Sequence, residues 1–172
     1  MDTFDIALLI LRIGIGLTFA AHGVQKTLGW WGGPGFRSWH AAIQHMGYRP
    51  AGLFAAVSDG AELIGGVFVT IGLLTPLAGA ALVAQSVVII GQAHWRKGFF
   101  NSNGGYEFPL ALGVGAAAVL LIGPGLWSVD AAIGFGVDPA VRSALPVAAL
   151  AAGLVTLAGP HAAIAHTRSH AS

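Results

Sequence analysis

Long apolar stretches alternate with short polar loops along the chain. They run from about residue 6 to 24, 51 to 74, 76 to 95 and 107 to 123. An α-helix rises roughly 1.5 Å per residue, so about 20 apolar residues cross the hydrocarbon core of a bilayer. The pattern therefore predicts an all-α fold, an integral membrane four-helix bundle.

A fifth apolar stretch, over residues 143–165, is uncharged and rich in alanine but contains Pro146 and Pro160. Its length and hydropathy predict an additional C-terminal transmembrane helix, with packing in the membrane interface as the alternative. We accordingly divide the chain into a four-helix transmembrane domain, residues 1–138, and a C-terminal extension, residues 139–172. The extension carries the fifth transmembrane helix and a short polar tail.

The composition excludes several classes of protein. Of the 172 residues, 55% are hydrophobic and only 9% are charged, whereas soluble domains carry roughly 25% charged residues. The formal net charge of +1 argues against a nucleic-acid partner, which requires clustered Lys and Arg. The chain has no cysteine, so redox chemistry would depend on a cofactor or substrate. No motif with metal-ligand spacing is present, and a metal site is not predicted.

Basic residues accumulate on one side of the membrane. With five spans, the side reached at the end of the first span holds Lys26, Arg37, Arg49, Arg96, Lys97 and Arg168, whereas the loops on the other side hold only Arg142. The positive-inside rule makes the basic side cytoplasmic. We therefore expect the N-terminus to lie outside.

Three ionisable residues, Arg12, Asp59 and Glu62, interrupt the first two spans near mid-membrane. A charged side chain without a partner at this depth costs free energy. Helical rise places Arg12 roughly 18 Å and Glu62 roughly 16 Å from the same membrane surface, and Gln85 at mid-depth. We predict an ion pair between Arg12 and Glu62 with Gln85 nearby. Asp59 lies one helical turn from Glu62. The group either holds the bundle together or serves function; the sequence leaves both open.

A second polar layer lies nearer the basic side, where the ends of three stretches converge. We predict His22, His94 and Glu107 as catalytic candidates, and Gln25, Lys26, Gln92, Trp95 and Tyr106 as ligand contacts. His and Gln hydrogen-bond carbonyl or hydroxyl oxygens, Lys stabilises an oxyanion and Glu exchanges protons. With aromatic walls, this chemistry suits a quinone head group. The aromatic residues could instead form an interfacial belt, and bis-histidine haem ligation is a weaker alternative.

Several short motifs resemble the DoxX family of small bacterial membrane proteins. They are Arg12-Ile13-Gly14, His22-Gly23-Val24-Gln25-Lys26, Glu62-Leu63-Ile64-Gly65-Gly66, Gly72-Leu73-Leu74-Thr75-Pro76, His94, Gly104-Gly105-Tyr106-Glu107-Phe108, Gly123-Pro124-Gly125 and Ser128-Val129-Asp130. The resemblance covers about residues 5–136. It implies a four-helix bundle in the bacterial inner (cell) membrane and a link to quinone-dependent oxidoreductases, including thiosulfate:quinone complexes, and to oxidative-stress systems. The region after residue 138 and the loop 28–50 depart from the family pattern.

Together these features favour a multi-pass, quinone-interacting subunit of a membrane oxidoreductase or redox-stress complex. Two alternatives stay open. One is a non-catalytic scaffold that recruits a soluble redox protein to the bilayer, and the other is a small-molecule or proton-coupled carrier that uses Asp59 and Glu62. Whether the protein catalyses a reaction is not decided by the sequence.

Overall fold

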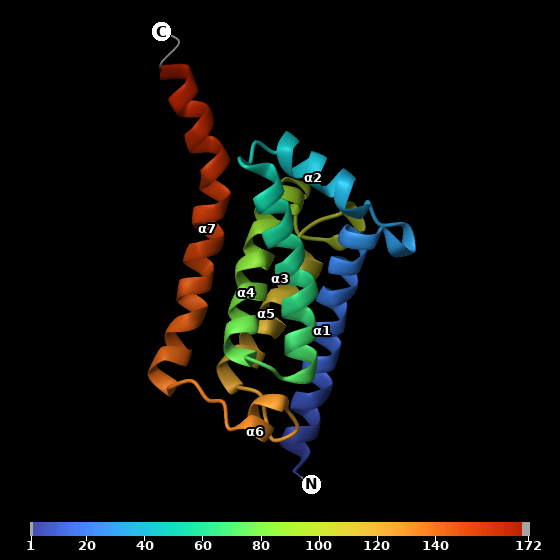
Figure 1. The fold of residues 1–172 in the computed structure, drawn as a ribbon, viewed down its shortest axis with the longest axis vertical. Coiled ribbons are helices and arrows are strands. Elements are labelled where there is room, and N and C mark those ends of the chain that lie inside the picture. Colours follow the sequence, from blue (N-terminus) through green and yellow to red (C-terminus); the bar gives the residue numbers. More distant parts are fainter. Residues whose placement is uncertain (1, 170–172) are drawn as a thin grey trace.

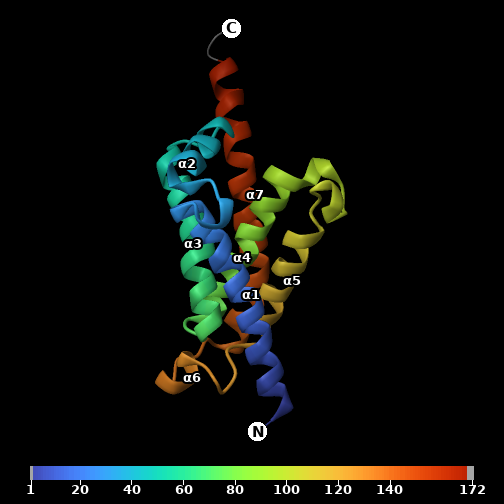
Figure 2. The same ribbon diagram turned by 90° about the vertical axis from the view of Figure 1, so that its right-hand side faces the viewer.

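The long helices lie side by side and form an elongated bundle (Figures 1 and 2). The structure is a computed structural model that describes the backbone of residues 2–169 and the side chains of residues 2–159. The bundle helices are α1 (Thr3–Leu28), α3 (Ala51–Ile71), α4 (Thr75–Ile89), α5 (Glu107–Ile122) and α7 (Pro139–Ser169). Residues 2–169 contain no strand, and the all-α prediction is confirmed.

Among the described residues, four helical segments are long and apolar enough to cross a membrane. They are Thr3–Leu28, Ala51–Ile71, Thr75–Lys97 and Pro139–Gly159, and the shorter apolar helix α5 packs beside them. The last segment confirms the expected C-terminal membrane helix. Its helix α7 continues through Pro146 without interruption.

Short elements close the two ends of the bundle. At one end, η1 (Trp30–Gly32) and α2 (Gly35–His45) follow α1, and α2 lies across the ends of the bundle helices (Figure 1). At the other end, α6 (Val129–Ile133) lies near the start of α1. Helix α7 returns the chain to the end that carries α2, as five passes require.

Helices α1 and α3 approach so closely that their backbones touch. A Cβ atom added to Gly66 would lie 2.6 Å from the carbonyl oxygen of Gly16, and one added to Gly16 would lie 2.5 Å from the carbonyl oxygen of Gly66. Small residues permit this approach in membrane bundles. Further along, Gly23 faces Leu63, and these contacts fix the relative height of the two helices.

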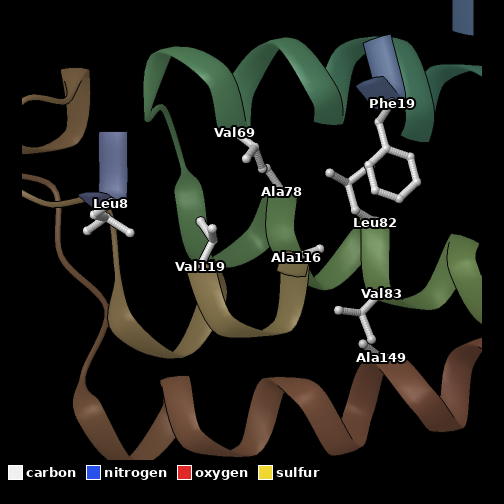
Figure 3. Close-up of a cluster of buried hydrophobic side chains, with 9 residues drawn as sticks. All are labelled: Leu8, Phe19, Val69, Ala78, Leu82, Val83, Ala116, Val119 and Ala149. Atoms are coloured by element: carbon white, nitrogen blue, oxygen red, sulfur yellow. The ribbon is translucent and has the colours of Figure 1, made fainter. Parts of the chain in front are cut away.

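Helix α4 occupies the centre of the bundle and packs against α3, α5 and α7. The apolar core around it comprises Leu8, Phe19, Val69, Ala78, Leu82, Val83, Ala116, Val119 and Ala149 (Figure 3). Because α4 is surrounded, its polar residue Gln85 is buried inside the bundle. Within the described residues, α7 packs along α4 and α5 and has no extended contact with α3.

Candidate functional site

A cavity of about 530 Å³ lies in the half of the bundle that α2 covers. Its apolar wall includes Phe19, Ile43, Phe54, Val57, Ala61, Val88, Phe108 and Leu112. Its polar and aromatic-polar lining comprises His22, Lys26, Trp39, Tyr48, Ser58, Glu62, Gln85, Gln92, His94 and Thr156. Helices α1, α2, α3, α4, α5 and α7 all contribute, so the site exists only in the assembled bundle.

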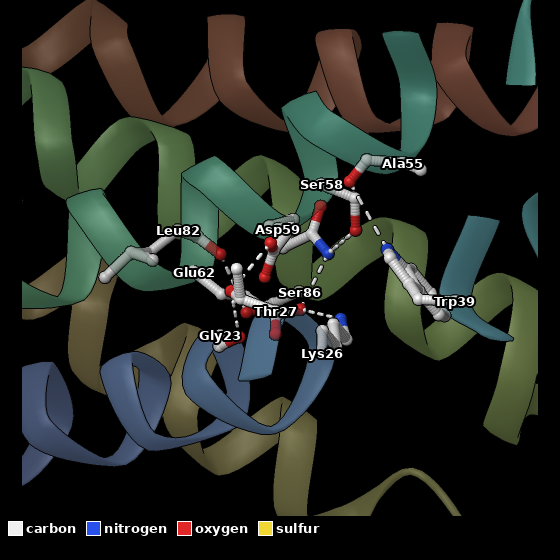
Figure 4. A network of polar contacts seen from close by, with 11 residues as sticks. Gly23, Lys26, Thr27, Trp39, Ala55, Ser58, Asp59, Glu62, Leu82 and Ser86 are labelled. Atoms are coloured by element: carbon white, nitrogen blue, oxygen red, sulfur yellow. Dashed lines mark hydrogen bonds and ion pairs between the residues drawn. The ribbon is translucent and has the colours of Figure 1, made fainter. Parts of the chain in front are cut away.

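A buried carboxylate, Glu62, organises the deep wall of the cavity. Its Oε1 atom accepts hydrogen bonds from the Lys26 ammonium and from Nε2 of Gln85, the latter at 2.8 Å. Its Oε2 atom has no partner within residues 2–159. The Gln85 amide also donates to Ser58 at 2.8 Å. The Lys26 ammonium lies 4.3 Å from the centre of the Trp39 ring, a cation–π contact (Figure 4).

The predicted ion pair between Arg12 and Glu62 is wrong, because Lys26 takes the place of Arg12. The predicted depths rested on the assumption that the end of α1 and the start of α3 lie at the same height. The contact of Gly23 with Leu63 instead sets the last turns of α1 level with Glu62. Arg12 lies further along, beside the Gly72 turn. The predicted proximity of Gln85 to Glu62 is confirmed.

Arg12 belongs to a separate buried cluster at the opposite end of the bundle. Its guanidinium donates to the carbonyl of Trp127, and the carboxylate that attracts it is Asp130. Asp130 accepts from the backbone N–H groups of Leu74 at 2.7 Å and Thr75 at 2.8 Å, capping α4. Sequence reasoning gave Asp130 no role, although it lies in one of the family-like motifs.

A π-helical turn, η2 (Ile90–His94), also lines the cavity, and turns of this type are frequent at functional sites. It carries Gln92, whose Nε2 donates to the Tyr48 hydroxyl at 2.6 Å. Burial raises the pKa of Tyr48 above its ordinary value, more than the Gln92 hydrogen bond lowers it. Tyr48 is therefore a neutral phenol whose proton is available to donate. Tyr48 was not among the predicted site residues, because it lies in a loop.

His94 has a defined tautomer in its neutral form. Its Nδ1 atom lies 2.6 Å from the carbonyl oxygen of Gly104. A carbonyl only accepts, so Nδ1 carries the proton and Nε2 is the acceptor. His22, the other predicted histidine, packs edge-on against Phe108 with ring centres 6.0 Å apart.

The structure brings four of the eight predicted site residues to the cavity and places the other four outside it. Those at the cavity are His22, Lys26, Gln92 and His94; those outside are Gln25, Trp95, Tyr106 and Glu107. Glu107 is exposed and accepts from the Asn101 backbone at 3.0 Å. Trp95 stacks on Tyr106 with ring centres 5.3 Å apart. The Gln25 amide contacts the Trp31 carbonyl at 3.5 Å.

The fold and site define an α-helical membrane protein whose bundle encloses a cavity with a buried polar wall. The chain belongs to the DoxX family, whose model matches residues 7–95, slightly more than half of its length. The match covers α1 to η2, which carry Lys26, Glu62 and Gln85. An uncharacterized membrane protein of Mycobacterium tuberculosis is 27% identical over 139 residues, covering 72% of this chain and 79% of that protein. No solved structure matches the chain.

Proposed function

We propose that this DoxX family membrane protein binds a quinone in the cavity, as a subunit of an oxidoreductase or redox-stress complex in the bacterial inner membrane. The observation that carries the proposal is a mainly apolar, aromatic cavity with a few convergent polar groups inside a membrane bundle. Small-molecule sites have this character, with volumes of roughly 300–1,000 Å³. The cavity falls within that range.

The polar groups suit the oxygens of a quinone ring. Lys26 donates to Glu62 through one N–H and has further N–H groups to offer a carbonyl oxygen, and the Tyr48 hydroxyl is a second donor. Nε2 of His94 is the complementary acceptor for the hydroxyl of a reduced ring. Trp39 and Phe54 supply aromatic surface beside these groups.

Residues of both α3 and α7 line the cavity, so the path proposed for an isoprenoid tail runs between these two helices. Helix α7 packs on α4 and α5 and has no extended contact with α3 among the described residues. The apolar cavity residues on this side are Val57 and Ala61 of α3 and Ala152 of α7. The ring would lie near Lys26 and Tyr48, and the tail would leave between the two helices into lipid.

Filling the cavity should weaken ligand binding. Ala61 lines the cavity, so Ala61→Phe places a ring in the space that the quinone needs. Ala56, on the same helix, is exposed and does not line the cavity, so Ala56→Phe is the matched control. Titration of purified protein with a decyl-substituted benzoquinone should show binding, and Ala61→Phe should raise the Kd at least about tenfold. A tenfold change in Kd corresponds to about 1.4 kcal/mol of binding free energy.

Ala56→Phe should bind as the unsubstituted protein does. Equal binding by the Ala61→Phe variant would place the quinone elsewhere on the protein. Absence of binding to the unsubstituted protein would overturn the proposed function.

A further inference from the structure

The Thr27 hydroxyl lies between two oxygen atoms that both normally accept hydrogen bonds. Its Oγ1 atom is 2.7 Å from the carbonyl oxygen of Gly23 and 2.8 Å from Oδ2 of Asp59 (Figure 4). A hydroxyl has one hydrogen, and neither a carbonyl nor an ionised carboxylate can donate. With Asp59 ionised, only one of these two short contacts is a hydrogen bond. Both are hydrogen bonds if Asp59 carries a proton.

We propose that Asp59 is a proton-binding site that is occupied at neutral pH. The proton resides on Oδ2, which donates to Thr27, and Thr27 donates in turn to the Gly23 carbonyl. With the proton on Asp59, both contacts are hydrogen bonds, and together they form a continuous chain from α3 to α1. It goes beyond quinone binding, since it holds whatever ligand the cavity takes.

Burial independently favours the protonated form of Asp59. The residue is 6% exposed, and its Oδ1 atom has no hydrogen-bond partner among the residues that the structure describes. An unpartnered oxygen of a neutral carboxyl costs less to bury than one of a carboxylate. Protonation therefore removes the larger part of the cost of placing Asp59 inside the bundle.

The nearby charges balance when Asp59 is neutral. The groups that act electrostatically on it are Lys26 of α1 and Glu62 of its own helix. Lys26 is hydrogen-bonded to Glu62, which Gln85 also stabilises. Helix α4 carries no charged residue, and His40 of α2 lies beside Gly52, two helical turns away. With a proton on Asp59, the three ionisable groups carry no net charge in the apolar bundle.

The position of this proton gives it a role at the cavity. Asp59 is one helical turn from Glu62, and Glu62 and Lys26 both line the cavity wall. A ligand that gains or loses a proton there has a stored proton within the same polar cluster. Asp59 acts through this cluster, since it does not itself line the cavity.

Infrared spectroscopy of the full chain in lipid tests the proposal. At neutral pH the protein should show the carbonyl band of a protonated carboxyl group, shifted to lower frequency in D2O. Asp59→Asn should remove this band. Asp138→Asn, which changes an exposed aspartate of the same chain, should retain it. Absence of the band from the unsubstituted protein, or its persistence in Asp59→Asn, would overturn the proposal.

A second variant tests the hydrogen-bond direction and does not require Asp59→Asn to fold. Thr27→Val keeps the shape of the side chain and removes the hydroxyl that accepts from Asp59. The carboxyl band should then move to higher frequency, because the carboxyl O–H loses its acceptor. An unchanged frequency would show that Asp59 does not donate to Thr27.

Discussion

Replacing Asp130 with alanine is expected to lower the free energy of unfolding by about 3–5 kcal/mol, the typical cost of leaving a buried charge uncompensated. Asp130 is fully buried, and both of its carboxylate oxygens accept from the first backbone N–H groups of α4. It also supplies the negative charge that attracts Arg12, which is 1% exposed. The substitution therefore uncaps the central helix and leaves a buried cation without its counter-charge.

Asp138 provides the matched control for this prediction. It caps α7 through the Ala140 backbone N–H at 2.8 Å, but it is exposed and has no buried cation beside it. Asp138→Ala should lower the free energy of unfolding by only about 1 kcal/mol, the typical cost of removing an N-cap side chain. Reversible unfolding in detergent, followed by helical content, measures both. Equal losses in the two variants would refute the assigned role of Asp130.

Substituting Lys26 with methionine should also lower the free energy of unfolding by about 3–5 kcal/mol. Methionine keeps most of the apolar stem and removes the ammonium that is hydrogen-bonded to Glu62. Glu62 is 1% exposed, so its charge is left inside the bundle with the Gln85 hydrogen bond in place of an ion pair. The same unfolding measurement gives the size of the loss.

Removing the second charge should reverse most of that loss. In the double variant Lys26→Met with Glu62→Met, no buried charge is left unpaired, and apolar replacement of a buried pair is often neutral or stabilising. A double-mutant cycle should therefore give a large coupling energy between positions 26 and 62. Additive losses would mean that the two residues do not interact in the folded protein.

Hydrophobic patterning was sufficient to predict the helical architecture. Runs of about 20 apolar residues can only be membrane helices or deeply buried ones, because the bilayer requires every backbone group to be satisfied within the segment. The same reasoning predicted the C-terminal helix, although Pro146 lies within it. The boundary between the apolar stretches 51–74 and 76–95 coincides with the turn between α3 and α4.

The pairing of charges could not be predicted in the same way. Counting residues gives the depth of a side chain along its own helix, but the stagger between helices depends on contacts such as Gly23 with Leu63. Because of this stagger, the partner of Glu62 is Lys26 and not Arg12. The long, flexible Lys26 side chain also reaches the cavity from the end of α1, so its backbone position alone is a poor guide.

Other parts of the site depend on irregular backbone. The π-helical turn brings Gln92 to Tyr48, and the periodicity of the sequence does not predict such a turn. The shared depth of Glu107 with the histidines suggested a common site, yet its side chain binds the neighbouring loop at Asn101. Depth alone cannot show on which face of a helix a side chain lies.

The most direct test of quinone binding in the cavity is a structure determined in lipid with an added decyl-substituted benzoquinone. We expect ring-shaped density inside the cavity that Trp39, Tyr48 and Gln92 line, with its tail between α3 and α7. The Ala61→Phe variant, prepared in the same way, should lack this density. A cavity that holds no ring, or a ring bound only outside it, would contradict the account.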